Sequence, residues 1–390
     1  MIAPADRLNQ VQEYYFSRKL KEVALMNAQG LDVISLAIGS PDMPPSKETI
    51  DTLYQEARKT DAHGYQPTMG TPELRSAMAR FYRRFYDVRL DPDKEILPLI
   101  GSKEGILHTT LALVNPGEGV LVPNPGYPTY TSLSKILGAR VISYDLLEDD
   151  GWQPDFAQLE RLASENEDIK LMWVNYPNMP TGGRARRETF ERLVEFGSRY
   201  GIVVINDNPY SFILNEGEKL SLLQIPGAKK CCMELNSMSK SHNMPGWRVG
   251  MLTGKEDFVQ WALKIKSNID SGTFRGIQLA AARAMDNTDA WHREYNVINY
   301  ARRRRHAEEI MHILDCTFDP EQAGMFLWGR IPDRYASCEQ LTERILQEAH
   351  VFITPGMIFG TNGSRYIRIS LCAKDDKFVE AVQRIRDVFA

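Results

Sequence analysis

The sequence has 390 residues, of which 43% are hydrophobic and 25% are charged, and its formal net charge is −4. A chain of this length predicts a large core divided between two domains. The balanced charge argues against nucleic acid as a partner, and no apolar run reaches the roughly 18 residues of a membrane span. The five cysteines form no CxxC pair, so we expect reduced thiols in the cytoplasm and no metal site.

Short apolar runs alternate with helical stretches along the first two thirds of the chain. The predicted strands are residues 33–38, 96–100, 120–123, 140–146, 171–175, 202–206, 231–235 and 248–252. Between them, residues 72–86 predict a helix with apolar side chains at three- and four-residue spacing and Thr71 as its N-cap. This alternation predicts an α/β fold with a mainly parallel sheet covered by helices.

The last third of the chain has a different pattern. A long charged helix is predicted over residues 288–314, followed by short strands and two more helices. Its four consecutive arginines, 302–305, indicate a solvated helix face better than a nucleic-acid patch, because the whole chain is acidic. We therefore predict a large domain over residues 46–280 and a smaller α+β domain that combines an N-terminal arm, residues 1–45, with residues 281–390.

Polar, turn-rich segments follow three of the predicted strands. The strand at 202–206 runs into Asp207-Asn-Pro-Tyr210, the strand at 171–175 into residues 176–182, and the strand at 231–235 into a segment that ends at Lys240. In open α/β sheets ligands bind beyond the carboxyl ends of the strands. The sequence therefore predicts a ligand site where these segments meet.

The segment SMSKSHNMPGWRVG, residues 237–250, suits pyridoxal phosphate (PLP). PLP needs a lysine amine that bonds to its aldehyde carbon, which Lys240 can supply. Its phosphate needs hydroxyl donors and an arginine, and Ser237, Ser239 and Arg248 fit that need. The SxSK pattern of residues 237–240 alone would fit a surface loop equally well, whereas the full fourteen-residue pattern favours the cofactor.

This segment resembles the PLP-lysine signature of the class I and II aminotransferases, which have PLP-dependent transferase fold type I. The resemblance extends in order from LAIGSPD (36–42) to YIRIS (366–370). It implies that Lys240, Asp207 and Tyr210 are the catalytic residues. Asp207 is implied to bind the pyridine nitrogen of PLP, and Tyr210 its phenolic oxygen.

The resemblance implies further cofactor contacts and a homodimer. Ser102 and Lys103, at the start of a helix after the strand at 96–100, are implied to bind the phosphate. Tyr127 is implied to stack on the ring. Tyr65 is implied to reach the phosphate in the other subunit of a homodimer with shared active sites.

Substrate contacts are also implied. Arg368 is implied to bind the α-carboxylate, and strand alternation places it opposite its isoleucine neighbours. Gly39 lies where the backbone is implied to close over the substrate, and Tyr15 with the N-terminal arm is implied to close over it too. Arg275 suits either a side-chain carboxylate or the protein surface.

One position departs from the family pattern. The asparagine that usually precedes proline in N-P-T-G, and that binds the phenolic oxygen, is Met179 here. A thioether cannot donate that hydrogen bond. We hypothesise that Asn178 or Asn175 takes its place.

The expected reaction is amino transfer from an amino acid to a 2-oxo acid in two steps. The stretches GSKEGI (101–106) and SNIDSGTF (267–274) are most similar to the LL-diaminopimelate aminotransferase-like branch. Relatives that act on aspartate, methionine, aromatic amino acids or kynurenine stay open. The alternatives are a carbon–sulfur β-eliminating lyase and, less favoured, a PLP-binding regulator without turnover, for whose DNA-binding domain 390 residues leave no room.

Overall fold

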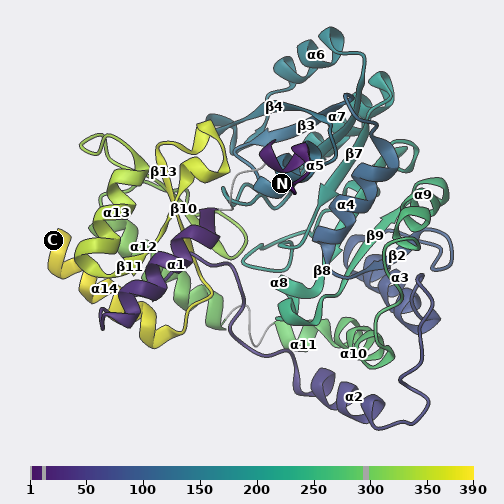
Figure 1. Cartoon of the computed structure of the whole chain (residues 1–390), viewed down its shortest axis with the longest axis horizontal. Helices are drawn as coiled ribbons and strands as arrows, with labels where there is room; N and C mark the ends of the chain where they lie inside the picture. Colours follow the sequence, from purple (N-terminus) through teal and green to yellow (C-terminus); the bar gives the residue numbers. More distant parts are fainter. Residues whose placement is uncertain (1, 11–14, 293–297) are drawn as a thin grey trace.

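The computed structural model describes residues 2–10, 15–292 and 298–390 (Figure 1). Its main sheet has eight strands in the order β2-β9-β8-β7-β6-β3-β4-β5. In chain order these strands are β2 (Ile96–Leu99), β3 (Gly119–Asn124), β4 (Arg140–Leu147), β5 (Gln153–Pro154), β6 (Ile169–Val174), β7 (Val203–Asp207), β8 (Cys232–Ser237) and β9 (Gly250–Gly254).

The centre of this sheet is parallel. Strands β4, β3, β6, β7 and β8 run in one direction. Strand β9 is antiparallel to both β8 and β2, so β2 points the same way as β8. The carboxyl ends of β2, β3, β6, β7 and β8 therefore lie along one edge. This arrangement confirms the predicted α/β fold with a mainly parallel sheet.

Helices surround the sheet as the alternating pattern predicted (Figure 1). They are α2 (Lys47–Ala57), α3 (Pro72–Tyr86), α4 (Ser102–Leu113), α5 (Pro128–Ile136), α6 (Phe156–Glu165), α7 (Arg187–Tyr200), α8 (Met238–Ser241), α9 (Glu256–Lys266), α10 (Arg275–Asp286) and α11 (Thr288–His292). Helix α3 has the predicted bounds, and Thr71 Oγ1 accepts a hydrogen bond from the backbone N–H of Leu74 at 3.3 Å.

A smaller group of elements lies beside the main sheet (Figure 1). Its strands β10 (Phe326–Arg330), β13 (Tyr366–Ser370) and β12 (Thr354–Pro355) form an antiparallel sheet. Around it lie α1 (Tyr15–Ala28), α12 (Ala301–Ile313), α13 (Cys338–Ala349) and α14 (Asp375–Phe389). The domain boundaries stay a prediction, and α10 runs through the predicted one at residue 280 while packing against α2 and α3.

The first predicted strand belongs to this smaller group. Only Ile34 and Ser35 form a strand, β1, and it pairs in parallel with β11 (Val351–Phe352). The apolar run at 33–38 predicted a strand but carries no information about its partner. Two chain segments more than 300 positions apart in the sequence are therefore joined by β1 and β11.

The arginine run on α12 is only in part the solvated face that its composition predicts, because Arg302 and Arg305 are exposed but the two arginines between them are not. Arg303 and Arg304 are buried. Arg303 forms a two-point ion pair with Asp42, at 2.7 and 2.9 Å, while Arg304 donates to the carbonyl of Gln322 at 2.7 Å. Ion pairing from distant loops made burial possible, which a local charge pattern cannot reveal. Residues 293–297 of the predicted helix lie outside the described part of the chain.

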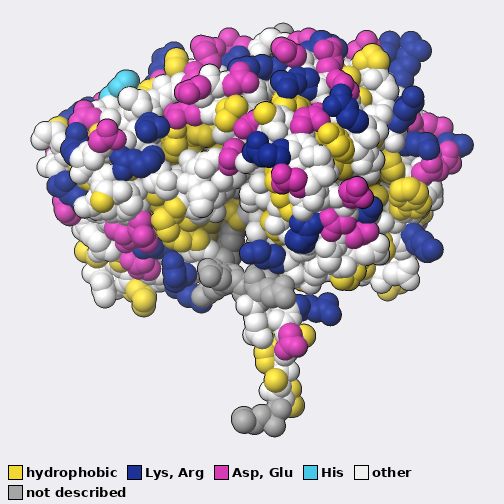
Figure 2. All heavy atoms as spheres, turned by 90° about the horizontal axis from the view of Figure 1, so that it is seen from above, with side chains coloured by type: hydrophobic (Ala, Val, Ile, Leu, Met, Phe, Trp, Pro, Cys, Tyr) yellow, Lys and Arg dark blue, Asp and Glu magenta, His cyan; other side chains and the backbone are white. Residues whose placement is uncertain are grey.

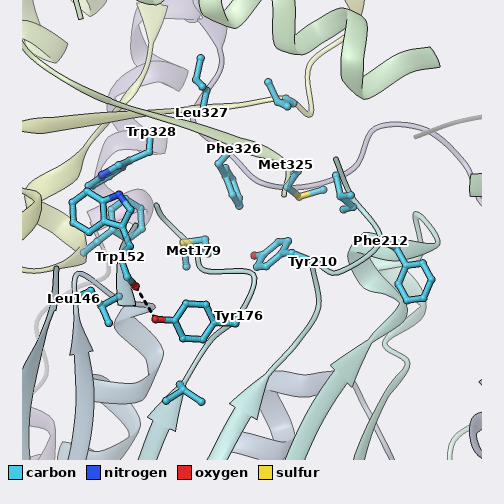
Figure 3. Packing of buried hydrophobic residues seen from close by; sticks show 14 of the residues in the cluster. Leu146, Trp152, Tyr176, Met179, Tyr210, Phe212, Met325, Phe326, Leu327 and Trp328 are labelled. Atoms are coloured by element: carbon cyan, nitrogen blue, oxygen red, sulfur yellow. Dashed lines mark hydrogen bonds between the residues drawn. The ribbon is translucent and has the colours of Figure 1, made fainter. Parts of the chain in front are cut away.

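An aromatic core joins the main sheet to the smaller one (Figure 3). The Tyr176 hydroxyl donates to the carbonyl of Trp152 at 2.7 Å, and Trp328 stacks on Tyr366 with ring centroids 4.9 Å apart. The five cysteines are free and buried, as the expected reduced thiols would be. In the part of the chain that the structure describes, no helix is long and apolar enough to cross a membrane.

Candidate active site

A cavity of about 660 Å³ lies at the carboxyl edge of the main sheet. Its walls come from the loops after β2, β3, β6, β7 and β8, from the smaller sheet and from α1. The predicted catalytic residues Lys240, Asp207 and Tyr210 all line it, as do Gly39 and Arg368. Segments spread over more than 300 residues of sequence therefore meet in one space.

Lys240 lies on α8, the short helix that starts directly after β8. Its ammonium group donates a hydrogen bond to the carbonyl of Gly39. Burial lowers the pKa of Lys240, and the positive charges of Arg368 and Arg248 lower it further. A larger share of this amine is therefore neutral, and able to act as a nucleophile or a base, than for a lysine in water.

Asp207 is the last residue of β7 and is buried. Its Oδ2 accepts a hydrogen bond from the Tyr130 hydroxyl at 3.0 Å, whereas no described protein group binds its buried Oδ1. Burial raises the pKa of Asp207 to about 7, against the opposing effect of the Tyr130 hydrogen bond. A buried carboxylate oxygen in this state suits a positively charged N–H donor in the cavity.

Tyr210 lies three residues beyond Asp207, on the same wall of the cavity. Burial raises the pKa of its hydroxyl, and the nearby Asp207 raises it further. The ring packs edge-on against Phe326, with centroids 5.8 Å apart. Tyr210 thus offers a neutral hydroxyl whose ring is held between the two sheets (Figure 3).

The start of α4 and the Arg248 side chain form an anion cup. Gly101, the N-cap of α4, has φ +82°, and Ser102 and Lys103 are the first two helical residues. Arg248 donates to the carbonyl of Ile100 at 3.2 Å and to the Ser239 hydroxyl at 3.4 Å. The backbone N–H groups of a helix N-terminus, together with a hydroxyl and a guanidinium, suit a phosphate group.

Glycine is required at position 101 by this cup. A Cβ atom there would lie 2.1 Å from Nη2 of Arg248, and the positive φ also disfavours any side chain. Ser237 has a supporting place: its hydroxyl accepts from the backbone N–H of Ser239 at 3.2 Å and so caps α8. Both Ser237 and Ser239 line the cavity.

Tyr127 also lines the cavity, at the N-cap of α5. Its ring meets the ring of Tyr130 edge-on, with centroids 5.5 Å apart. Tyr130 was missed in the sequence, although it follows Tyr127 at helical spacing. A spacing of three residues places both rings on the same side of α5, so it could have indicated that Tyr130 belongs to the site.

The two asparagines near Met179 differ in position. Asn175 lines the cavity, but its amide donates to the Asp207 carbonyl at 2.5 Å and accepts from the Met179 N–H at 2.8 Å. Asn178 does not line the cavity, and its Oδ1 accepts from Thr181. Met179 itself lines the cavity. The substitution of either asparagine for the family residue stays a prediction.

Arg368 projects from β13 into the cavity. It donates to the carbonyl of Ala37 at 2.8 Å and to the sulfur of Met179 at 3.2 Å. Its guanidinium carbon lies 4.0 Å from the ring centroid of Phe326 and 4.7 Å from that of Phe359. The aromatic faces hold a fork of N–H donors in a fixed orientation at the cavity wall.

Three residues considered in the sequence lie elsewhere. Tyr15 does not line the cavity; its α1 neighbours Phe16, Ser17 and Leu20 do. Tyr65 is 95% exposed on the surface, next to the bridge between Gln66 and Gly272. Arg275 pairs with Asp61 at 2.9 Å and with Glu56 at 3.5 Å.

A cluster of charged side chains contacts α4, the helix whose N-terminus forms the anion cup. Lys266 on α9 donates to Glu104 at 2.7 Å and to Asp270 at 2.7 Å, and His108 bonds Glu104 at 2.6 Å. The two carboxylates with His108 have the composition of a metal site, but the Lys266 ammonium already supplies a cation between them. The cluster ties α4 to α9 and to the loop at 267–274.

Comparisons with known proteins agree with this geometry. The family model described as aminotransferase class I and II matches residues 31–385. LL-diaminopimelate aminotransferases of Oleidesulfovibrio alaskensis and Moorella thermoacetica are 40% and 38% identical to the chain, each over 98% of both chains. The substrate-bound BacF structure from Bacillus subtilis superposes with a TM-score of 0.94 at 30% identity, covering 100% of this chain and 98% of BacF.

The chain belongs to the class I and II aminotransferases. Members of this family are PLP-dependent enzymes with fold type I, and the sheet order and the smaller α+β part described above have that architecture. The protein is therefore a transaminase, which moves an amino group from an amino acid to a 2-oxo acid.

Proposed function

We propose that this cavity binds PLP and that Lys240 carries it covalently. The observation that carries the proposal is the buried Asp207 carboxylate, whose Oδ1 has no described protein partner and which lines the same cavity as the anion cup. PLP has a ring nitrogen that can be protonated and a phosphate. The protonated ring nitrogen is complementary in charge to Asp207, and the phosphate is complementary to the anion cup.

The residues that would hold PLP follow from their chemistry. Ser102, Lys103, Ser239 and Arg248 would bind the phosphate, and Ser237 would position α8. Tyr127 would stack on the ring, Asp207 would keep the ring nitrogen protonated, and Tyr210 would donate to the phenolic oxygen. When bound, PLP supplies an electron sink for the charge that develops at the substrate α-carbon.

The protein supplies orientation and proton transfer. Arg368 would bind the α-carboxylate through two N–H donors, which fixes the α-carbon against the lysine. Lys240, with its lowered pKa, would take the proton from that carbon as a general base and would deliver it as a general acid to the C4′ carbon of PLP. Closure of the cavity by Gly39 and α1 would exclude water.

We also propose a homodimer with shared sites. Support comes from large apolar side chains that are exposed on the single chain, among them Tyr65, Tyr54 and Ile269. The bridge between Gln66 and Gly272 joins the Tyr65 loop to the segment 267–274. A narrow N-terminal segment also projects from the body (Figure 2). Apolar surface of this kind suits an interface between subunits.

LL-diaminopimelate is one candidate donor, because the similar curated enzymes are named for it. The location in the cytoplasm stays a prediction. The scattered charges of both signs on the face shown in Figure 2 fit small-molecule substrates better than nucleic acid.

Covalent trapping tests the cofactor assignment. The protein is loaded with PLP, reduced with borohydride and digested, and the peptides are analysed by mass spectrometry. The label should lie on Lys240, and Lys240→Ala should carry none. Lys103→Ala is the control, because it removes the other cavity lysine and should leave the label on Lys240. A label on Lys103, or no label at all, would contradict the proposal.

A further inference from the structure

We infer that the amino donors of this enzyme carry one carboxylate and an apolar side chain, such as phenylalanine, leucine or methionine. The inference rests on the proposed function, because it assigns the α-carboxylate to Arg368. It concerns the rest of the same cavity, where the donor side chain must lie.

The wall contributed by α1 and the segment after β1 is mainly apolar, with Ser17 as its polar side chain. Phe16 and Leu20 lie one turn apart on α1, and Ile38 follows β1; all three line the cavity. Phe16 also lies 5.8 Å from the Arg368 guanidinium carbon, measured to its ring centroid. The apolar wall therefore begins beside the group that binds the α-carboxylate.

The surroundings of Arg368 continue this apolar surface. Met179 contacts the guanidinium through sulfur, and Phe326 and Phe359 cover its faces. Figure 3 shows Phe326 on the side of the smaller sheet, and Met179 and Tyr210 on the loops above the main sheet. A donor held by its α-carboxylate on Arg368 is thus surrounded by aromatic rings and a flexible thioether, which suit apolar side chains.

The cations of the cavity are already assigned. Among the described residues that line it, the positive side chains are Lys103, Lys240, Arg248 and Arg368. Two of them belong to the anion cup and one is the reacting lysine. Arg275, the outside candidate for a second carboxylate, is paired with Asp61 and Glu56.

Within the part of the cavity that one subunit supplies, a second charged group on the donor would therefore lie against α1, Ile38 and the aromatic rings beside Arg368, where the described lining offers it no free charged partner. Moving a carboxylate from water to an apolar wall without a partner costs far more free energy than burial of an apolar side chain contributes to binding. The same holds for the distal carboxylate and ammonium of LL-diaminopimelate, since Asp207, the acidic residue of the described lining, is assigned above to the cofactor ring nitrogen. We expect discrimination of at least about tenfold, which corresponds to 1.4 kcal/mol.

The first test is the half-reaction of the PLP-loaded enzyme with single amino acids, followed by its absorbance. The kcat/KM for phenylalanine, leucine and methionine should exceed that for aspartate, glutamate and LL-diaminopimelate by at least about tenfold. A preference for any of the last three would overturn the inference and leave the proposed function intact. No half-reaction with any of them, together with no borohydride label, would instead refute the proposed function.

The second test measures binding without turnover and decides the inference separately. Hydrocinnamate, an aromatic monocarboxylate, should raise the melting temperature of the loaded enzyme more than glutarate, a dicarboxylate of similar length. Leu20→Arg, at a site that is 43% exposed, should reverse this order and increase glutamate turnover. Leu25→Arg, on the same helix but 66% exposed and outside the cavity lining, should leave the order unchanged. Stronger protection by glutarate in the unmodified enzyme would contradict the inference.

Discussion

Tyr130 donates a hydrogen bond to Oδ2 of Asp207 across 3.0 Å, and its ring stacks on Trp173 with centroids 5.0 Å apart. The stacked indole fixes the phenol, and the phenol fixes the carboxylate. Asp207 therefore keeps one oxygen bound to the protein and presents the other to the cavity. This arrangement orients the charge that would act on the cofactor ring.

Tyr130→Phe should lower the fraction of Asp207 that is negatively charged and should leave its carboxylate less well oriented. Loss of one buried hydrogen bond costs about 1 kcal/mol and raises the pKa of Asp207 further, because the opposing effect of the hydroxyl is gone. We expect kcat/KM to fall about fivefold to tenfold, measured with the best donor over a range of pH. Tyr144→Phe is the control, because it also removes a buried hydroxyl bond, at 2.7 Å to the Trp173 carbonyl, but does not contact Asp207. Equal pH profiles for the two variants would contradict the role of Tyr130.

The raised pKa of Asp207 predicts how the cofactor-free protein responds to pH. Between the ordinary value of 3.8 and about 7 the folded protein holds a proton that the unfolded chain has lost. The free energy of unfolding should therefore fall as pH rises through this window. Urea unfolding of the cofactor-free protein at several pH values measures the slope, and Asp207→Asn should make it less negative. An unchanged slope in that variant would show that Asp207 does not hold the extra proton.

Gly101→Ala should damage the anion cup. The new Cβ would collide with Nη2 of Arg248, and the backbone conformation adds strain of about 1–3 kcal/mol. We expect PLP affinity to fall by at least about tenfold, measured by fluorescence titration. Gly117→Ala separates the two effects, since Gly117 also has positive φ but no atom lies within 4 Å of the added Cβ. It should lose stability and keep PLP affinity, and an equal loss of affinity would argue against the cup.

The ion pair between Arg303 and Asp42 should stabilise the loop that carries Gly39. Arg303→Met leaves a partly buried carboxylate behind, so we expect the free energy of unfolding to fall by about 2–4 kcal/mol. Arg302→Met removes an ion pair with Asp375 in which both side chains are about one third to one half exposed, and it should cost less than about 1 kcal/mol. Denaturant titration compares the two. Similar losses in the free energy of unfolding would show that the buried ion pair stabilises the protein no more than the exposed one.

The sequence predicted the parts of this molecule that depend on local pattern. Continuous apolar runs predicted the buried strands, and the polar residues directly after them lie at the carboxyl edge because parallel strands end together. That is why Asp207, Lys240 and Ser102 could be placed at one site in advance.

Contacts over long sequence distances could not be predicted in this way. The pairing of β1 with β11, the burial of Arg303 by Asp42, and the arrival of Phe16 beside Arg368 each join segments hundreds of residues apart. Each depends on packing of the whole chain, and no periodicity or motif encodes the partner. The apolar cavity wall formed by Phe16, Leu20 and Ile38, from which the class of amino donor is inferred, could not be predicted from the sequence for this reason.

The visible spectrum of the PLP-loaded enzyme shows whether the cofactor on Lys240 takes an amino group from a donor. It is recorded before and after addition of one amino acid at a time, with no 2-oxo acid present. We expect the yellow band of the lysine-bound cofactor to decay while a near-ultraviolet band of its aminated form grows, and we expect neither change for Lys240→Ala. A yellow band that persists with every donor, or release of pyruvate and ammonia without amination of the cofactor, would contradict amino transfer and favour the lyase reaction.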